Sequence, residues 1–450
     1  MIEAETEHEG GKMKTVITFI LLLALVVSPA VLMAAQSGNA GPAVIPLPES
    51  LPVQDTLPSP SLPQVSDTTA APAFILNSSS YLSTYGLNTN NTDNDYLPFY
   101  EDLNFKCPVV KNDLSIEASG WLNYDLLTSQ YAQRTNTDFS YAYLNYTPKQ
   151  IPLRIKLGRI YSYFGVAGDQ YDGMEIMLNN IYGFGVDGFA GSEVDSELHN
   201  TPGGVTTGGR LFYNNTFFGV GGSMFYAANG DYISQERWGV DGWVRPINML
   251  SMFGRYYYDT VDKRAYDGTV KVSLTPIKRL FLDAQYGLFN PASLIDKTSI
   301  FWVFNTESYR NLNGDIGYRI LDNLSLAIEG TKYMYSSEGN SYSYGGRLNY
   351  DKQPYALGLE LNKVDSTPTD YMTSRIYVFR SFAMGFYANI DAVYTSYLGI
   401  LNGYRHSITG HVAVGKEIIN NLKLTLSGDS LDGPYMRHGG FAMLSLKYSL

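Results

Sequence analysis

Residues 114–126 read LSIEASGWLNYDL, and in this stretch apolar and polar side chains alternate. Leu114 and Ile116 fall on one face of an extended chain, whereas Glu117 and Asp125 fall on the other. This period of two predicts a β-strand with one apolar and one polar face. Such a strand suits a wall between lipid and water, although a soluble β-sandwich shows the same alternation.

The alternation recurs along the chain and is divided by turns of two lengths. Short turns are expected at residues 148–152, 214–216, 246–249, 276–279, 321–323, 351–354 and 419–421, and long loops at 191–206, 291–307, 364–370 and 397–404. Tight periplasmic turns and longer external loops are typical of outer-membrane barrels. We therefore predict an all-β fold, a transmembrane antiparallel β-barrel of about 22 strands over residues 74–450. A count of 20 stays open, because the segment around Asp172 to Leu178 looks short for a strand.

Aromatic residues support a membrane setting. The chain contains 37 tyrosines, and only 17% of its residues are charged. Aromatic side chains near expected strand ends predict the girdles that mark the two membrane interfaces, and they are Tyr141, Tyr143, Tyr146, Tyr161, Tyr163, Phe164, Tyr256, Tyr257, Tyr258, Tyr333 and Tyr335. The final residues, GGFAMLSLKYSL, resemble the terminal signal read by the outer-membrane insertion machinery, with Leu450 where Phe or Trp is usual. These features predict location in the cell outer membrane.

The N-terminal part of the chain contains targeting and spacer signals. Residues 1–12 are acidic and polar and are interpreted as a non-native extension. Residues 13–35 have a basic start, an apolar run and small residues at the end, which predicts a signal peptide. A retained transmembrane anchor is the alternative. Residues 36–73 are rich in proline and predict an extended periplasmic linker, either a plain spacer or a docking segment.

The polar face of the predicted strands collects both signs of charge. In this register the candidate pore-lining residues are Glu117, Asp125, Lys156, Arg210, Asp241, Arg245, Lys271, Asp283, Asp315, Arg319, Glu329, Arg347, Glu360, Arg375, Asp391 and Lys423. A barrel this wide is either constricted or conducts water. The loops 191–206 and 291–307 are candidates for a constriction; the apolar run SIFWVF at 299–304 folds inward, meets a partner or is a misplaced strand. Alternatively, the charges only pair with each other.

Other classes of function find little support in the residues. A net charge of −11 argues against nucleic acid as a partner. Cys107 is the only cysteine, so an internal disulfide and a multi-thiolate metal site are excluded. No histidine spacing, nucleophile elbow or haem-attachment motif is present, and the glycines of YGFGVDGFAG at 182–191 are interpreted as strand residues. We therefore expect neither an enzyme nor a cofactor.

Several stretches between Tyr81 and Pro246 resemble a known family. They are YLSTYGLNTN, PFYEDLNF, LSIEASGWLNYDL, YAYLNYTP, IKLGRIYSYFGVAGDQYDGMEI and RWGVDGWVRP. They resemble porin-like outer-membrane proteins of metal-reducing Gram-negative bacteria, some of which partner multihaem cytochromes in electron-transfer conduits. The chain lacks the N-terminal C-x-x-C that some conduit sheaths contain.

Two functions have positive support in the sequence. The leading prediction is a channel for passive diffusion of small hydrophilic solutes or ions through a charge-lined lumen. The alternative is a structural barrel sheath around a multihaem cytochrome, and an adhesion or docking barrel is a third class without positive sequence support. The expected partners are outer-membrane lipid and lipopolysaccharide, the insertion machinery during assembly and, for the sheath, the cytochrome.

Overall fold

The computed structural model describes residues 74–89, 92–110, 113–126, 135–194, 202–230, 232–290, 308–336, 339–365, 370–434 and 436–449. The chain divides into two units, residues 1–67 and 68–450, and every described residue belongs to the second. The predicted extension, signal peptide and linker, the expected loop 291–307 and its SIFWVF run therefore lie outside the described residues.

The described chain is built almost entirely of strands. They are β1 (Ile75–Thr89), β2 (Thr92–Tyr96), β3 (Pro98–Val110), β4 (Leu114–Asp125), β5 (Thr135–Tyr146), β6 (Leu153–Phe164), β7 (Ala167–Ile181), β8 (Phe184–Val194), β9 (Pro202–Asn214), β10 (Phe218–Asn229), β11 (Tyr232–Ile247), β12 (Leu250–Asp259), β13 (Arg264–Ile277), β14 (Leu280–Phe289), β15 (Tyr309–Leu321), β16 (Leu324–Tyr335), β17 (Asn340–Lys352), β18 (Tyr355–Asp365), β19 (Tyr371–Ser381), β20 (Phe386–Leu401), β21 (Tyr404–Ile419), β22 (Leu422–Gly433) and β23 (Met436–Ser449). A short 3-10 turn, η3 (Ala383–Gly385), joins β19 to β20. None of the described helices is long and apolar enough to cross a membrane.

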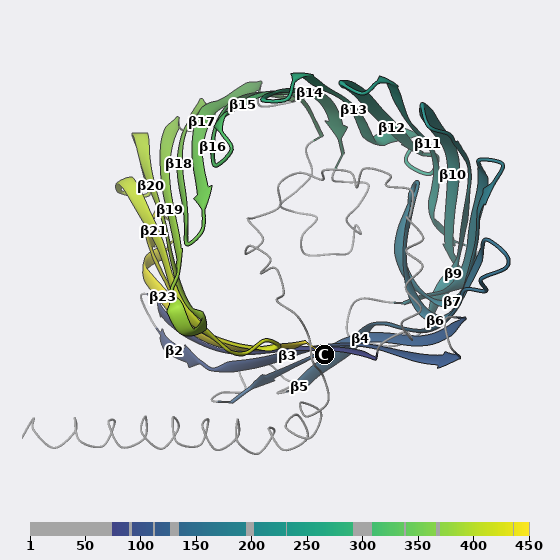
Figure 1. Cartoon of the computed structure of the whole chain (residues 1–450), viewed down its shortest axis with the longest axis horizontal. Helices are drawn as coiled ribbons and strands as arrows, with labels where there is room; N and C mark the ends of the chain where they lie inside the picture. The colour runs from purple at the N-terminus through teal and green to yellow at the C-terminus, as the bar shows by residue number, and fades with distance from the viewer. Residues whose placement is uncertain are drawn as a thin grey trace, which may run out of the picture. The chain divides into compact units, whose positions relative to one another are not determined.

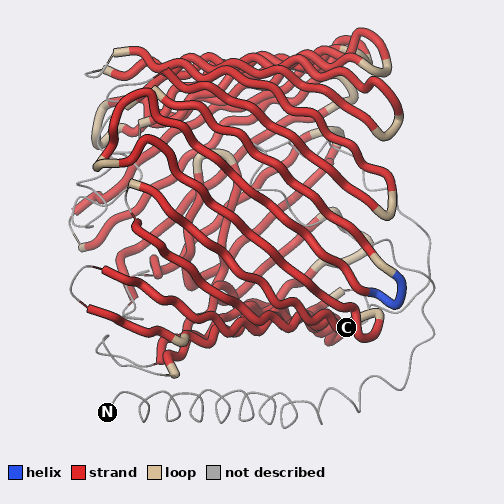
Figure 2. The backbone as a smooth tube through the Cα atoms, turned by 90° about the vertical axis from the view of Figure 1, so that its left-hand side faces the viewer, coloured by secondary structure: helices blue, strands red, loops and turns tan. Residues whose placement is uncertain are grey.

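Each strand pairs antiparallel with the next along the chain, and the two ends of the sheet meet. β1 pairs with β23 from Asn77↔Ser449 to Gly86↔Gly440, which closes the sheet into a barrel (Figure 1). On its other side β1 pairs with β3 and then with β2, so β2 and β3 share one place in the wall. The barrel therefore has 22 places, as predicted from the turn pattern. Figure 2 shows the strands inclined to the barrel axis, as closure requires.

Three expectations about strand ends differ from the structure. The segment around Asp172 to Leu178 is not short, because it lies within the 15-residue β7, and this removes the case for 20 strands. The expected long loop at 397–404 is a two-residue turn, because β20 runs to Leu401 and β21 starts at Tyr404. Asn402 and Gly403 have φ angles of 49° and 86°, the geometry of a tight hairpin turn that suits an Asn-Gly pair. The expected loop 191–206 is likewise shortened, since β8 continues to Val194 and β9 begins at Pro202.

The two faces of the wall differ in chemistry. One face exposes large apolar side chains on strand after strand, among them Leu157, Val240, Ile316, Ile328, Leu359, Ile376, Ile390, Val412 and Leu426. The opposite face contains the charged residues. Side chains on this second face reach across an intervening strand: Arg210 of β9 pairs with Asp241 of β11, and Arg347 of β17 lies 3.6 Å from Asp315 of β15. Such contacts form on the concave side of a curved sheet, so the charged face is the inner wall.

Candidate functional site: the inner wall and the β6–β7 hairpin

The register places the candidate pore-lining side chains on the inner wall. Asp283, Asp315 and Glu329 are opposed in succession across β14, β15 and β16. Arg347, Glu360 and Arg375 oppose one another across β17, β18 and β19, and this row meets β16 at Ala327, two residues from Glu329. Most of the remaining members share this face: Glu117, Lys156, Arg210, Asp241, Lys271, Arg319, Asp391 and Lys423. Arg245 lies at the register shift after Val244, so the ladder does not place it. Asp125 ends β4, and its side chain lies outside the described structure.

Many of these charges form ion pairs around the wall. The pairs are Lys106–Glu117 at 2.9 Å, Lys156–Glu175 at 2.6 Å, Arg210–Asp241, Arg255–Asp267 at 3.0 Å, Lys271–Asp283 at 3.8 Å, Arg347–Asp315 at 3.6 Å, Arg375–Asp391 at 2.5 Å and His411–Asp429 at 2.8 Å. Acidic and basic side chains are therefore interspersed around the circumference instead of occupying opposite walls. A solute in the lumen would meet short-range dipoles of both signs.

Sequence reasoning missed six charged residues in this set. They are Lys106, Glu175, Arg255, Asp267, His411 and Asp429, all of which form inner-wall ion pairs. Each lies on the same two-residue period as a residue that was selected: Lys106 opposes Glu117, and Arg255 opposes Asp241. Extending each strand's alternation to its full length would have found them.

The main departure from a plain barrel is the β6–β7 hairpin. β6 pairs with β5 only from Ile155 to Arg159, after which β6 continues with β7 to a turn at Gly165. Gly158 marks the point of departure with φ of +134°, and a Cβ there would lie 2.3 Å from the carbonyl oxygen of Ala142. Only glycine fits this position. The end of the hairpin then crosses the inner wall, where the backbone N–H of Val166 donates to Ser223 Oγ of β10 at 2.9 Å.

A buried apolar cluster holds the hairpin inside the barrel. The hairpin contributes Ile160, Phe164, Val166, Ala167 and Tyr171, and the wall contributes Phe189, Phe225, Ala227, Tyr257 and Tyr266. The rings of Tyr171 and Phe189 stack with centroids 4.5 Å apart, and the Tyr266 hydroxyl donates to the carbonyl of Val166 at 3.3 Å. Burial of so many large side chains fixes the hairpin as part of the folded core. In Figure 1 a blue strand stands inside the ring of strands beside β10.

A buried carboxylate lies beneath this cluster. Glu175 of β7 is only 2% exposed, and its Oε1 lies 2.6 Å from Lys156 Nζ. Its Oε2 accepts hydrogen bonds from the Ser162 hydroxyl at 2.9 Å and the Tyr171 hydroxyl at 3.3 Å. The carboxylate is therefore satisfied from both strands of the hairpin, as a buried charge requires. Glu175 ties the curved end of the hairpin to its base.

The aromatic girdle prediction is wrong for several of its members. Phe164 and Tyr257 are buried in the cluster behind the hairpin, and the Tyr143 hydroxyl donates to Glu117 on the inner wall at 3.0 Å. Tyr333 also belongs to the inner face, because it opposes Asn311. Tyr256, by contrast, is exposed on the outer face. Tyrosines at strand ends are shared between the lumen and the membrane, so their number alone does not locate an interface.

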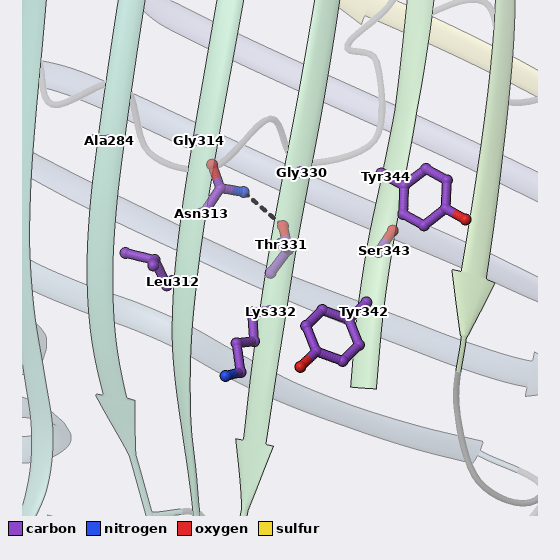
Figure 3. A pocket seen from close by; sticks show the side chains of 10 residues that line it. All are labelled: Ala284, Leu312, Asn313, Gly314, Gly330, Thr331, Lys332, Tyr342, Ser343 and Tyr344. Carbon is purple, nitrogen blue, oxygen red and sulfur yellow. Dashed lines mark hydrogen bonds between the residues drawn. The ribbon is translucent and has the colours of Figure 1, made fainter. Parts of the chain in front are cut away.

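A shallow depression lies in the wall of β14 to β17 (Figure 3). Ala284, Gly314 and Gly330 have short or no side chains, and Leu312 and Tyr342 stand at its borders. Leu312 and Tyr342 are exposed on the outer face, whereas Asn313 donates a hydrogen bond to Thr331 on the inner face, so the depression lies where the wall is thin. Within the part of the chain that the structure describes, no group of His, Cys, Asp and Glu side chains is arranged to hold a metal ion.

Comparisons with known proteins bear on the fold. No protein family model matches the sequence, and no curated protein matches it. Among solved structures, the siderophore receptor PirA from Pseudomonas aeruginosa is similar with a TM-score of 0.53 and 11% identity, covering 83% of this chain and 80% of that one. The translocation pore of the P pilus usher PapC has a TM-score of 0.51 and 10% identity, covering 83% of this chain and 99% of that one.

The fold is that of a large outer-membrane barrel. Both similar structures share the architecture with this chain at very low identity, so the likeness concerns the fold alone. The closed wall of 22 places leaves no open edge at the β1–β23 junction, and its outer face is apolar, as a membrane-spanning sheet requires. The protein therefore belongs to the cell outer membrane. The resemblance to proteins of metal-reducing bacteria stays a prediction.

Proposed function

We propose that the barrel is a passive diffusion channel for small hydrophilic solutes or ions. The observation that supports this function best is the charged inner wall, which contains ion pairs from Lys106–Glu117 on β3 and β4 to His411–Asp429 on β21 and β22. A wall of this composition is wetted, and a barrel of 22 strands is wider than its own side chains can fill. Solutes then cross the membrane by diffusion through a hydrated lumen, without a catalytic step.

The hairpin limits the size of the solutes that pass through this channel. It occupies the inner wall from β8 to β13 and so narrows the lumen on one side. Arg159 lies on the hairpin face away from the buried cluster, where it bonds Asp172 at 2.9 Å and Asp138 at 3.0 Å. Solutes would pass between this polar surface and the ion pairs of β15 to β22. Outer-membrane lipid, lipopolysaccharide and the insertion machinery are the partners that this role implies.

Single-channel recording tests the proposal. The full chain, refolded in detergent, is inserted into a planar phosphatidylcholine bilayer under a salt gradient. We expect stable open steps whose reversal potential is small, because both signs of charge line the wall. Correctly folded barrels that never conduct would overturn the channel and favour the alternative, a sheath around a multihaem cytochrome. Heat-dependent gel mobility serves as the control that the barrel is folded.

A further inference from the structure

The wall contains a seam where hydrogen bonding between neighbouring strands stops halfway. β5 and β6 pair at Ala142↔Arg159 and continue only to Tyr146↔Ile155, five positions in all. β5 nevertheless extends back to Thr135 and stays paired with β4 along that length. Among the described residues, no strand pairs with the other side of residues 135–141. The inward turn of the hairpin has removed the partner that would have covered this edge.

The open half of the seam lies at the height of the outer leaflet. The short turn at 147–152 joins β5 and β6 at the periplasmic end, so residues 135–141 lie toward the external end. A tilted strand crosses the membrane in roughly 9–11 residues, and β5 has 12. Unpaired backbone does not occur against hydrocarbon, because each uncovered polar group costs several kcal/mol there. Water from the lumen must therefore reach this edge.

Among the described residues, side-chain contacts cross the open half. Gln170 Nε2 donates to the carbonyl oxygens of Phe139 and Ser140, at 2.9 Å each. Arg159 lies between Asp138 of β5 and Asp172 of β7. These contacts hold the hairpin to the β5 edge without forming a ladder. They are partly exposed, and side-chain bonds of this kind exchange with water far more easily than a paired strand does.

The residues around the seam combine apolar bodies with polar groups. Phe139 is 59% exposed on β5, and Leu157 is exposed on the outer face of β6. On the hairpin face away from the buried cluster, the rings of Tyr161 and Tyr163 lie 4.2 Å apart, and Tyr163 is 78% exposed. Tyr161 opposes Gln170 of β7, whose side chain donates a hydrogen bond to the carbonyl of Phe139. Exposed aromatic side chains therefore flank the polar groups of Gln170 and Arg159 along the seam.

We propose that the seam between β5 and the β6–β7 hairpin is a lateral portal. Through it, amphipathic molecules with an apolar or aromatic body and a polar head move between the lumen and the outer leaflet. This route differs from axial diffusion of hydrophilic solutes and does not depend on it. The head group follows Gln170 and Arg159, and the body follows Phe139, Tyr161 and Tyr163.

Spin labels test whether lipid reaches the hairpin. In a Cys107→Ser background, nitroxides are placed at Tyr163→Cys, at Tyr377→Cys on the inner wall of β19 and at Ile376→Cys on its outer face, all in phosphatidylcholine vesicles. Collisions with oxygen report lipid, and collisions with a nickel chelate report water. We expect the label at 163 to meet both, with oxygen contact close to that at 376. A label at 163 that meets only the chelate, as at 377, would overturn the portal.

Transport of an amphipathic probe provides the second test. Entry of dansyl-aminoundecanoic acid into a porin-deficient Gram-negative host is followed by its fluorescence in the membrane. Gln170→Ala should speed entry roughly fivefold, the factor that corresponds to one net hydrogen bond. The matched control Asn313→Ala loses a single side-chain bond to Thr331 on the inner wall and should change nothing. Equal rates for both variants, or an equal rise in arabinose flux with Gln170→Ala, would contradict the proposal.

Discussion

The two halves of the barrel wall are stabilised by different interactions. From β14 to β23 neighbouring strands pair along most of their length, outer side chains are apolar and inner side chains form surface ion pairs. From β5 to β13 the wall lacks part of the β5–β6 ladder, and the β6–β7 hairpin packs against the inner wall through a buried apolar cluster. The first half is a single layer of paired strands with an apolar outer face and a charged inner face. The second half resembles the core of a soluble protein, enclosed within a membrane barrel.

The comparison shows what replaces backbone pairing when a strand leaves the sheet. Residues 135–141 of β5 lose the ladder on one side, and the hairpin gains the cluster around Phe189 together with the buried Glu175. Hydrophobic burial and a hydrogen-bonded buried carboxylate stabilise the position of the hairpin in place of backbone hydrogen bonds. Mutations should therefore have large effects on the hairpin side and small effects on the plain side.

The largest effect should follow removal of a ring from the cluster. Phe189→Ala deletes a buried side chain that contacts Phe164, Tyr171 and Phe225, and should lower the free energy of unfolding by about 4 kcal/mol. Guanidinium unfolding in lipid vesicles measures the loss. Leu359→Ala on the outer face of β18 is the control and should cost about half as much, because lipid fills the space left behind. Equal losses would show that the cluster is no better packed than the lipid contact.

The second effect concerns the buried carboxylate. Glu175→Gln leaves the Lys156 ammonium buried beside a neutral group and should destabilise the barrel by about 3 kcal/mol. Glu360→Gln on the inner wall of β18 is the matched control, and since that side chain is half-buried and bonds Asn362, its loss should stay under about 1 kcal/mol. The same unfolding assay compares them. A small loss at Glu175 would mean that water hydrates the space beneath the hairpin.

The third effect tests the bend in β6. Gly158→Ala puts a Cβ 2.3 Å from a carbonyl oxygen at a positive φ, and should cost about 2 kcal/mol as the bend relaxes. Gly314→Ala adds the same atom where nothing lies within 4 Å and should be neutral. Thermal loss of the folded gel band reports both. If Gly158→Ala matched Gly314→Ala, the hairpin would not depend on this glycine.

The smallest effect is expected in ion selectivity on the plain wall. Asp391→Asn leaves Arg375 without its partner and should shift the reversal potential toward anions, and Arg375→Gln should shift it toward cations. Each shift should be a few millivolts, because one charge among many is removed from a wide lumen. Bilayer recordings in a salt gradient measure it. Shifts of the same sign in both variants would indicate a structural change in place of an electrostatic one.

The sequence predicts the plain half of the barrel well and the hairpin side poorly. Alternation with period two determines which side chains share a face, so the placing of Glu360 and Arg375 on the inner face follows from local pattern alone. The strand count followed from the turns, and it was uncertain only at β7, where the chain stops behaving as a simple wall strand.

The hairpin was missed because its cause is not local. Residues 160–171 keep a strand pattern whether the hairpin lies in the wall or inside it, and only contacts with Ser223 and Tyr266, far along the chain, decide between them. The available hint was glycine at 158, 165 and 168 around the aromatic run IYSYF. Glycine in a strand suggests a bend or a close approach of backbone. It does not tell the direction of the bend.

The pairing of β23 on both sides has a consequence for how the protein comes into being. Until residues 436–449 are in place, β22 and β1 each present a row of free backbone groups. A chain that ends before β23 cannot close into a barrel. It forms a curved sheet with two unpaired edge strands, and such edges associate with other chains. A premature stop before β23 should yield aggregates that periplasmic proteases remove, and never a smaller working barrel.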